Sequence, residues 1–177
     1  NIHELNKEQD EAYHKIQELF KEKNTVLLHG VTSSGKTEVY IHLIKKYIYE
    51  GKQVLYLLPE IALTTQITGR LKRVFGDELG VYHSKFPDAE RVEIYKKQLS
   101  DKPYKIILGV RSSIFLPFTD LGLVIIDEEH EQSYKQQEPA PRYNARNAGI
   151  MLAGMFNAKT LLGTATPCLE TYSNALN

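Results

Sequence analysis

Residues 30–37 carry the side chains and spacing needed to hold a chain of phosphates. A glycine is followed by four variable positions and then by Gly35, Lys36 and Thr37. This is the pattern G-x-x-x-x-G-K-[ST], in which backbone amides surround phosphates, the lysine reaches the β- and γ-phosphates, and the hydroxyl binds Mg²⁺. The sequence therefore predicts a nucleoside triphosphate site with Mg²⁺. We expect nucleotide contacts from Gly30, Thr32, Ser33, Ser34, Gly35, Lys36, Thr37 and Glu38.

A second group of residues could catalyse hydrolysis of that triphosphate. The apolar run 123–126 ends in Asp127 and Glu128. We expect Asp127 to hold Mg²⁺ through a water molecule and Glu128 to polarise the attacking water, because phosphoryl transfer depends on positioning and charge stabilisation. Two acids after a strand could instead complement the dipole at the start of a helix. The phosphate loop upstream favours the catalytic interpretation.

Two further segments have both a structural and a functional interpretation. Thr164 and Thr166 follow the apolar run 160–162 and could contact the γ-phosphate or the acidic pair. They could equally form a strand-end turn in which Pro167 opens a helix. Asn6 and Gln9 have the spacing of a capping box, which explains Gln9 without any ligand. An adenine contact by the Gln9 amide is the alternative, and the spacing alone favours the cap.

Short apolar runs alternate with segments of helical period along the chain. The runs lie at 25–28, 53–58, 79–83, 105–108, 123–126 and 160–162, and the helical segments at 7–23, 36–49, 60–75, 89–99 and 144–156. Near-continuous apolar strands separated by helices predict an α/β fold, a mostly parallel sheet with helices on both faces. Right-handed crossovers bring the loops after all the strands to one edge, where ligands of such sheets bind. The phosphate loop, Pro59, His83, Arg111, Asp127 and Thr164 all lie at or just after the ends of these runs.

Composition limits the classes of function. The 177 residues contain 22 basic and 22 acidic side chains, so a nucleic acid would have to be bound by a local groove and not by a basic surface. The single Cys168 excludes an internal disulfide and an all-cysteine metal site. No membrane-length apolar run occurs, and we expect a cytoplasmic location without membrane contact. We also expect residues 1–177 to be one domain from a longer protein.

The motifs together resemble the first RecA-like lobe of superfamily 2 DEAD/DEAH-type helicases. The finer pattern is similar to the family of replication-restart helicases known as primosomal protein N′, and it covers essentially the whole chain. The segments that carry this resemblance are 30–40, 58–64, 82–84, 109–115, 127–136, 141–146 and 163–170. Ser34 and Asn144 depart from the family's usual Gly and His, but neither change removes a chemical group used above.

The resemblance implies roles for several residues. Residues 5–9 resemble an adenine-reading motif, so Gln9 is implied to contact adenine in addition to capping the helix. His130 is implied to act with Lys36, Asp127 and Glu128 and to couple the ATP site to the DNA site, although it could simply be a polar residue at a strand end. Thr164 and Thr166 are implied to take part in the same coupling.

Contacts with single-stranded DNA are also implied. They would come from Pro59, Glu60, Thr64, His83, Arg111, Ser112, Tyr134, Lys135, Arg142, Tyr143 and Arg146. Tyrosines can stack on bases at about 1–3 kcal/mol per base, and nearby cations can contact phosphates. Structural alternatives stay open: Pro59 and Glu60 form an ordinary helix start, Arg111 could make a surface ion pair, and the tyrosines could pack their loop onto the domain.

The resemblance further implies a function that needs more than this chain. Such helicases bind ATP and Mg²⁺ between two RecA-like lobes, translocate 3′ to 5′ on single-stranded or forked DNA, and work with primosome and single-strand-binding proteins. Zinc is expected only in a downstream region that this sequence lacks. Because a missing arginine finger costs about 10³ to 10⁵ in kcat, we expect the isolated chain to be nearly inactive. The alternatives are another superfamily 2 translocase or repair helicase, or a phosphate-loop enzyme or switch without nucleic acid.

Overall fold

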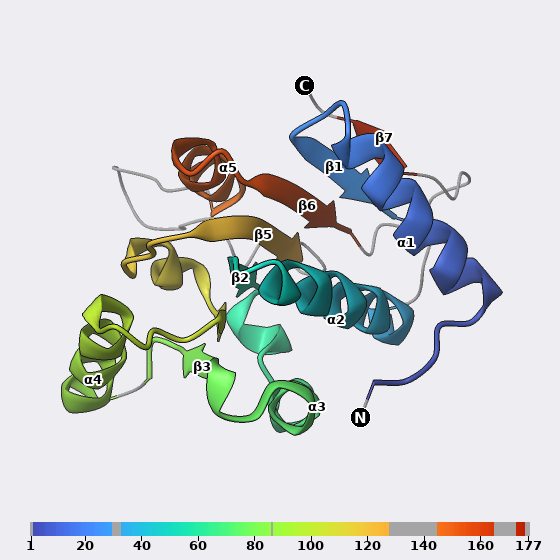
Figure 1. The fold of residues 1–177 in the computed structure, drawn as a ribbon. Coiled ribbons are helices and arrows are strands. Elements are labelled where there is room, and N and C mark those ends of the chain that lie inside the picture. The colour runs from blue at the N-terminus through green and yellow to red at the C-terminus, as the bar shows by residue number, and fades with distance from the viewer. Residues whose placement is uncertain (1, 30–32, 86, 128–144, 165–172, 176–177) are drawn as a thin grey trace, which may run out of the picture.

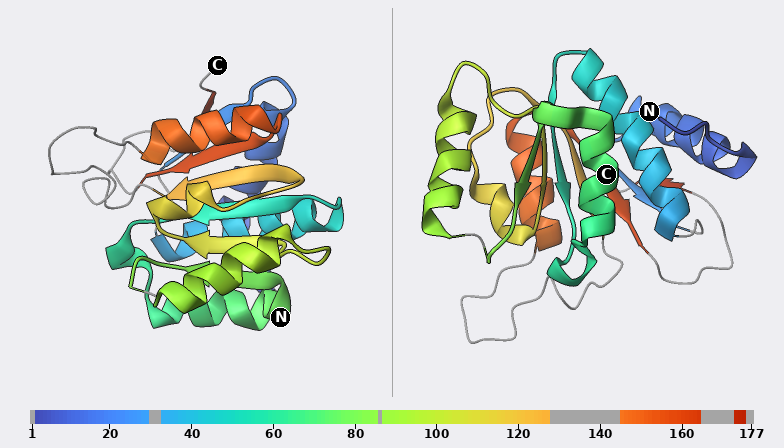
Figure 2. Two further views of the ribbon diagram at one scale, coloured as in Figure 1. Left: turned by 90° about the vertical axis from the view of Figure 1, so that its left-hand side faces the viewer. Right: turned by 90° about the horizontal axis from the view of Figure 1, so that it is seen from below.

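The computed structural model describes residues 2–29, 33–85, 87–127, 145–164 and 173–175. One sheet lies between two layers of helices (Figures 1 and 2). The helices are α1 Lys7–Phe20, α2 Ser33–Tyr49, α3 Thr65–Phe75, α4 Asp88–Leu99 and α5 Ala145–Met155, with 3-10 turns η1 Glu60–Ala62, η2 Gly76–Glu78 and η3 Arg111–Phe115. The strands are β1 Thr25–Leu28, β2 Gln53–Leu57, β3 Leu79–Tyr82, β4 Ile106–Gly109, β5 Leu121–Asp127, β6 Lys159–Gly163 and β7 Ser173–Ala175.

The described strands form one sheet in the order β3-β4-β2-β5-β6-β1-β7. Strands β1 to β6 run parallel, and β7 pairs antiparallel with β1 at the edge. The predicted α/β fold with a mostly parallel sheet is therefore confirmed. Strand β7 was not predicted, since three residues are too few to show a period. None of the described helices is long and apolar enough to cross a lipid bilayer.

Alternate residues of the central strands enter two separate cores. On β2, the side chains of Val54 and Tyr56 belong to one hydrophobic core with residues of α1, α2 and α3. Those of Leu55 and Leu57 belong to the other core, with residues of α4 and α5. The right-hand view of Figure 2 shows these two sets of helices on opposite faces of the sheet. Because both faces are covered, every residue of β2, β4 and β5 is buried. This burial explains why the strands read as continuous apolar runs.

The helix predicted over 60–75 is wrong as a single element. The structure has the short turn η1 and then α3, separated at Leu63 and Thr64. Thr64 has extended backbone angles, and its hydroxyl accepts a hydrogen bond from the Ile67 amide at 3.3 Å. A threonine in this position begins a new helix because it satisfies an amide that has no partner within the helix. The periodicity of 60–75 did not reveal this cap.

The strand order divides the carboxyl edge of the sheet into two adjacent halves. Helix α2 follows β1, Asp127 is the last residue of β5, and Thr164 follows β6; these three strands are consecutive in the sheet. The segments that begin at Pro59, His83 and Val110 follow β2, β3 and β4, which are also consecutive. Strands β2 and β5 pair directly and join the halves. The fold thus separates the two predicted groups of residues and places them side by side.

Candidate nucleotide site and the adjoining edge of the sheet

The nucleotide half of the edge centres on Lys36 and Asp127. Lys36 lies in the first turns of α2 with a fully buried side chain, and Asp127 is the last residue of β5. The Lys36 ammonium nitrogen is 3.6 Å from Oδ1 of Asp127, and among the described residues it has no hydrogen-bond partner. An ammonium has three hydrogens to donate, so this buried group can donate hydrogen bonds to phosphate oxygens. The structure thus brings together two residues that are 91 positions apart, by their numbers.

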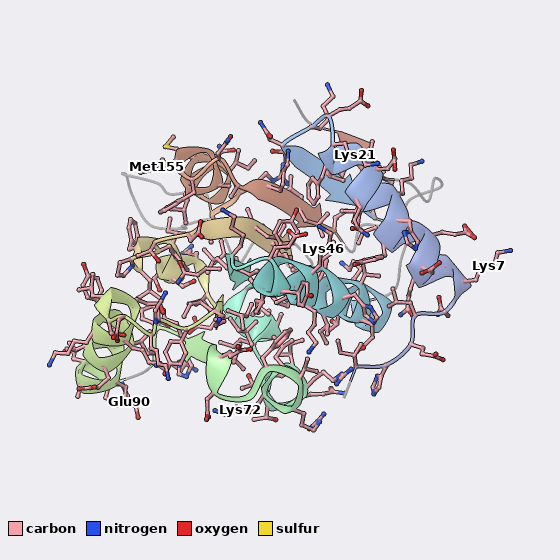
Figure 3. The ribbon with its side chains drawn as sticks, viewed as in Figure 1. Lys7, Lys21, Lys46, Lys72, Glu90 and Met155 are labelled. Atoms are coloured by element: carbon pink, nitrogen blue, oxygen red, sulfur yellow. The ribbon has the colours of Figure 1, made fainter. Side chains whose placement is uncertain are left out.

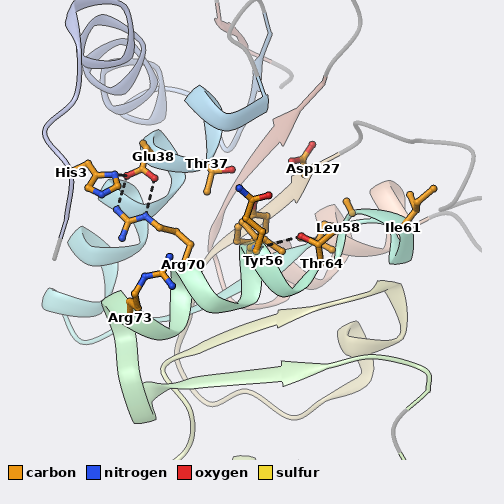
Figure 4. A pocket seen from close by; sticks show the side chains of 13 residues that line it. His3, Thr37, Glu38, Tyr56, Leu58, Ile61, Thr64, Arg70, Arg73 and Asp127 are labelled. Atoms are coloured by element: carbon orange, nitrogen blue, oxygen red, sulfur yellow. Dashed lines mark hydrogen bonds and ion pairs between the residues drawn. The ribbon is translucent and has the colours of Figure 1, made fainter.

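Thr37 and Asp127 line one cavity, whose volume is about 590 Å³ (Figure 4). The cavity lies between the first turn of α2 and helix α3, and the side chains of Leu58, Ile61 and Thr64 border it as well. A hydroxyl and a carboxylate are oxygen ligands of the kind that Mg²⁺ prefers. The residues present therefore fit a magnesium ion, and Thr37 with Asp127 would hold it.

Glu38 has a partner other than the predicted nucleotide. Its carboxylate accepts hydrogen bonds from Nε of Arg70 at 3.1 Å and from Nη2 at 2.9 Å, and Nδ1 of His3 lies 3.5 Å from Oε1 (Figure 4). The hydrogen bonds from Arg70 hold the pKa of Glu38 below its ordinary value. This pair ties the phosphate-loop helix to α3. Sequence reasoning missed Arg70, because nothing in its spacing links it to Glu38.

Gln9 joins helix α1 to the phosphate loop. The predicted capping box is confirmed: the Asn6 side chain accepts from the Gln9 amide at 2.8 Å, and the Gln9 side chain accepts from the Asn6 amide at 2.9 Å. The Gln9 side-chain nitrogen also donates to the Gly35 carbonyl at 3.2 Å. One hydrogen bond thus joins Gln9 to Gly35 while two others fix it within the cap of α1, and its contact with adenine stays a prediction.

Gly163, at the end of β6, lies between the end of β1 and Asp127. In the sheet register, Gly163 at the end of β6 pairs with Leu28 of β1 on one side and with Asp127 of β5 on the other. The Thr164 amide donates to the Leu28 carbonyl at 3.1 Å. The start of the predicted coupling segment is therefore adjacent to β1, which precedes the phosphate-loop helix, and to β5, which ends in Asp127.

The other half of the edge is built from the loops after β2, β3 and β4. Pro59 caps η1, and the Glu60 carboxylate accepts a short hydrogen bond from the Ser84 hydroxyl, which ties the loop after β2 to the loop after β3. His83 accepts from the Lys85 amide at 3.1 Å. Arg111 begins η3 directly after β4.

Two of the remaining described residues predicted to bind DNA lie on other elements, whereas Ser112 follows Arg111 in η3. Thr64 caps α3 on one face of the sheet, and Arg146 is exposed in the first turn of α5, which covers the other face. The hydroxyl of Ser112, in η3, is buried and makes no hydrogen bond within the described part of the chain.

Comparison with known proteins identifies the family. A family model described as "DEAD/DEAH box helicase" matches residues 6–175. The chain belongs to this family. It is 49% identical over 98% of its length to the replication restart protein PriA of Chlamydia trachomatis serovar D, and 44% identical over 97% to that of Bacillus subtilis strain 168. The predicted resemblance to replication-restart helicases is therefore confirmed. The chain spans only 23% and 21% of those relatives, respectively.

Solved structures of helicases share the fold of this chain. The structure of RecG bound to a three-way DNA junction superimposes with a TM-score of 0.65 at 26% identity, over 93% of this chain and 21% of that one. The helicase MrfA bound to DNA and AMPPNP gives 0.64 at 18% identity, over 97% of this chain and 25% of that one, a likeness of fold alone. The RecA-like architecture implied by the sequence motifs is thus confirmed.

Part of the helicase motif set lies outside the described residues. This applies to Gly30, Thr32, Glu128, His130, Tyr134, Lys135, Arg142, Tyr143 and Thr166. The backbone of Ser33 and Ser34 forms the first turn of α2, but their side chains are also outside the description. The roles given to these residues stay predictions.

Proposed function

We propose that this chain is the ATP-binding, N-terminal RecA-like lobe of a longer ATP-dependent DNA helicase. In our proposal the whole protein moves 3′ to 5′ on DNA and acts in replication restart and primosome assembly. The observation that carries the proposal is the buried Lys36–Asp127 pair, which shares the carboxyl edge of the sheet with the loops after β2, β3 and β4. Similarity to proteins named replication restart protein PriA supports the biological setting.

In this proposal each site residue has a separate role in ATP hydrolysis. Lys36 would neutralise charge on the terminal phosphates, while Thr37 directly and Asp127 through a water molecule would hold the magnesium ion. Glu128 orients and polarises the water, and Gln9 positions the end of the phosphate loop through Gly35. Magnesium, when bound, neutralises charge that develops on the phosphates. Every one of these groups acts by position and charge, as phosphoryl transfer requires.

The paired strands β2 and β5 provide the route between ATP and DNA. Leu57 pairs with Ile126 in the register, so the segment at Pro59 and Glu60 begins directly beside Asp127. A displacement of Asp127 on binding or hydrolysis would therefore reach the proposed DNA-contacting loops through one pair of strands. The bonds from Glu38 to Arg70 provide a second link, from the phosphate-loop helix to α3.

The full-length protein is proposed to supply what this chain does not contain. A second RecA-like lobe would contribute arginine fingers worth about 10³ to 10⁵ in kcat, so the isolated lobe should hydrolyse ATP near background. Zinc, if used, would bind elsewhere in the longer protein. Single-stranded or forked DNA, primosome proteins and single-strand-binding proteins are its proposed partners, and the cytoplasm its location.

The closest alternative function is that of another DNA translocase or repair helicase. The likeness to RecG, whose structure was determined on a three-way DNA junction, favours this alternative over a nucleotide switch. A switch without nucleic acid would not need Glu128, which the sequence retains. Restart of replication on forked substrates, assayed with primosome components, separates the two helicase functions.

The test uses the full-length protein and two variants with opposite expectations. Glu128→Gln should bind a nonhydrolysable ATP analogue normally and lose DNA-stimulated hydrolysis, whereas Lys36→Ala should lose analogue binding itself. Lys46→Ala is the matched control, because Lys46 lies on the same helix (Figure 3) and forms a surface pair with Glu50 at 2.9 Å. Identical analogue binding by the Glu128 and Lys36 variants would refute the assigned roles. Unwinding of 3′-tailed but not 5′-tailed duplexes would support the polarity.

A further inference from the structure

Tyr40 is a fully buried residue that no part of the proposed mechanism yet uses. It lies one helical turn after Lys36 on α2, and residues four apart on a helix lie on the same face. Its ring packs edge-on against Tyr56 of β2, with centroids 5.3 Å apart and planes at 80°. The tyrosine therefore projects from the phosphate-loop helix onto the sheet, beside the buried lysine.

The hydroxyl of Tyr40 reaches the end of strand β6. A Cβ atom built on Gly163 would overlap that hydroxyl oxygen and would lie 3.1 Å from the ring carbon that carries it. The same Cβ would lie 3.8 Å from Oδ1 of Asp127. The hydroxyl thus occupies the space of the side chain that Gly163 lacks, and this space borders the Asp127 carboxylate.

Packing alone does not explain a tyrosine at this position. Burial of a hydroxyl costs free energy unless it gains polar contacts, so a phenylalanine would fill an apolar core at lower cost. Here the oxygen lies at the carboxyl edge, against Gly163 and in the space that borders Asp127. Asp127 is the residue to which the proposed function gives the magnesium ion.

We propose that Tyr40 is a positioning residue for ATP hydrolysis. Its hydroxyl fixes the end of β6 at Gly163, and with it Thr164, against the Asp127 carboxylate. Gly163 is required because any side chain there would displace the hydroxyl. This inference rests on the proposed function and assigns one more residue to the same site.

The first test is Tyr40→Phe in the full-length protein, which removes a single oxygen atom. The matched control is Tyr47→Phe on the same helix, whose ring lies beside Gly122 near the start of β5, at the opposite edge of the sheet. We expect both variants to keep the wild-type melting temperature and the affinity for a nonhydrolysable ATP analogue. Only Tyr40→Phe should lower the DNA-stimulated kcat, by about 10- to 100-fold, with KM for ATP nearly unchanged, because small misplacements of catalytic groups cost this much.

The second test asks whether Gly163 and the hydroxyl occupy the same space. Gly163→Ala should lower the melting temperature in the wild-type background, because the new methyl group meets the hydroxyl. Combined with Tyr40→Phe it should be better tolerated, since the nearest ring carbon is then 3.1 Å away. The double variant should therefore melt above Gly163→Ala alone while its kcat stays low.

The outcomes separate this inference from the proposed function. If Lys36→Ala still binds the analogue, the proposed function fails. If Lys36→Ala loses binding while Tyr40→Phe retains the wild-type kcat, the function stands and the role of Tyr40 is refuted. Loss of folding by Tyr40→Phe, or equal melting of Gly163→Ala in both backgrounds, also refutes it.

Discussion

The buried Lys36–Asp127 pair should destabilise the chain when either charge is removed alone, but not when both are removed. The Lys36 side chain is fully buried and that of Asp127 is 9% exposed, so neither charge is solvated by bulk water. Lys36→Met removes the buried cation beside the Asp127 carboxylate, and Asp127→Asn removes the buried anion beside the Lys36 ammonium. The combined variant removes both charges and keeps similar volumes.

The magnitude follows from the 3.6 Å separation of the two charged atoms. Unit charges at that distance attract by about 5 kcal/mol at an effective dielectric constant of about 20. Loss of one member of a buried pair typically costs about 3–5 kcal/mol, whereas exchange of the whole pair for neutral groups is neutral or stabilises by about 1–4 kcal/mol. We therefore expect each single variant to lose about 3 kcal/mol or more of unfolding free energy, and the double variant to be at least as stable as the wild type.

Urea denaturation of the 177-residue chain without nucleotide measures these differences. The four proteins form a double-mutant cycle, and an unchanged m-value shows that the folded and unfolded states still differ by the same exposed surface. If the double variant loses as much free energy as the two single variants added together, the two side chains do not form a pair. That result would also remove the main support for a shared phosphate and magnesium site.

Two further predictions concern the links within the domain. Arg70→Met should cost about 1.5–3 kcal/mol at neutral pH, since it removes two hydrogen bonds to the charged Glu38. Because Arg70 lowers the pKa of Glu38 from its ordinary 4.5, this contribution is present above pH 4.5 and lost as the pH falls through the lowered pKa, which urea titrations at several pH values would show. Gly149→Ala should destabilise by about 1–3 kcal/mol, because its Cβ would lie 2.6 Å from a methyl group of Ile126. Gly154→Ala on the same helix meets nothing within 4 Å and should stabilise by about 0.4–1 kcal/mol; equal melting temperatures for the two glycine variants would contradict this account.

The sequence predicted most of the elements, because the apolar runs report burial on both faces of the sheet. Strand β1 at Thr25–Leu28 has the predicted bounds, and the cap formed by Asn6 and Gln9 is local enough to read from spacing. The single helix over 60–75 failed because a helical period continues across Thr64, whose capping geometry depends on the backbone. Strand β7 was not predicted because its formation depends on pairing with β1, and its own three residues show no strand pattern.

The chemical groups proposed for the site were also predicted from local sequence patterns. The phosphate loop and the acid after an apolar run are short motifs, and each motif fixes a chemical group at the end of a strand. The contacts of Arg70 with Glu38 and of Tyr40 with Gly163 could not be predicted from the sequence. They join residues 32 and 123 positions apart, by their numbers, and depend on how the helices lie across the sheet.

The amino-acid sequence by itself predicted which groups would bind and hydrolyse a nucleotide, and it determined the alternation of strands and helices that makes the sheet parallel. Only the tertiary structure decided which strands are neighbours. The order β3-β4-β2-β5-β6-β1 buries Lys36 beside Asp127, places Gly163 between β1 and β5, and assigns the remaining loops to the other half of the edge. The physical reason is that local periodicity reports burial, while strand order depends on crossovers and packing between segments that are distant in the chain.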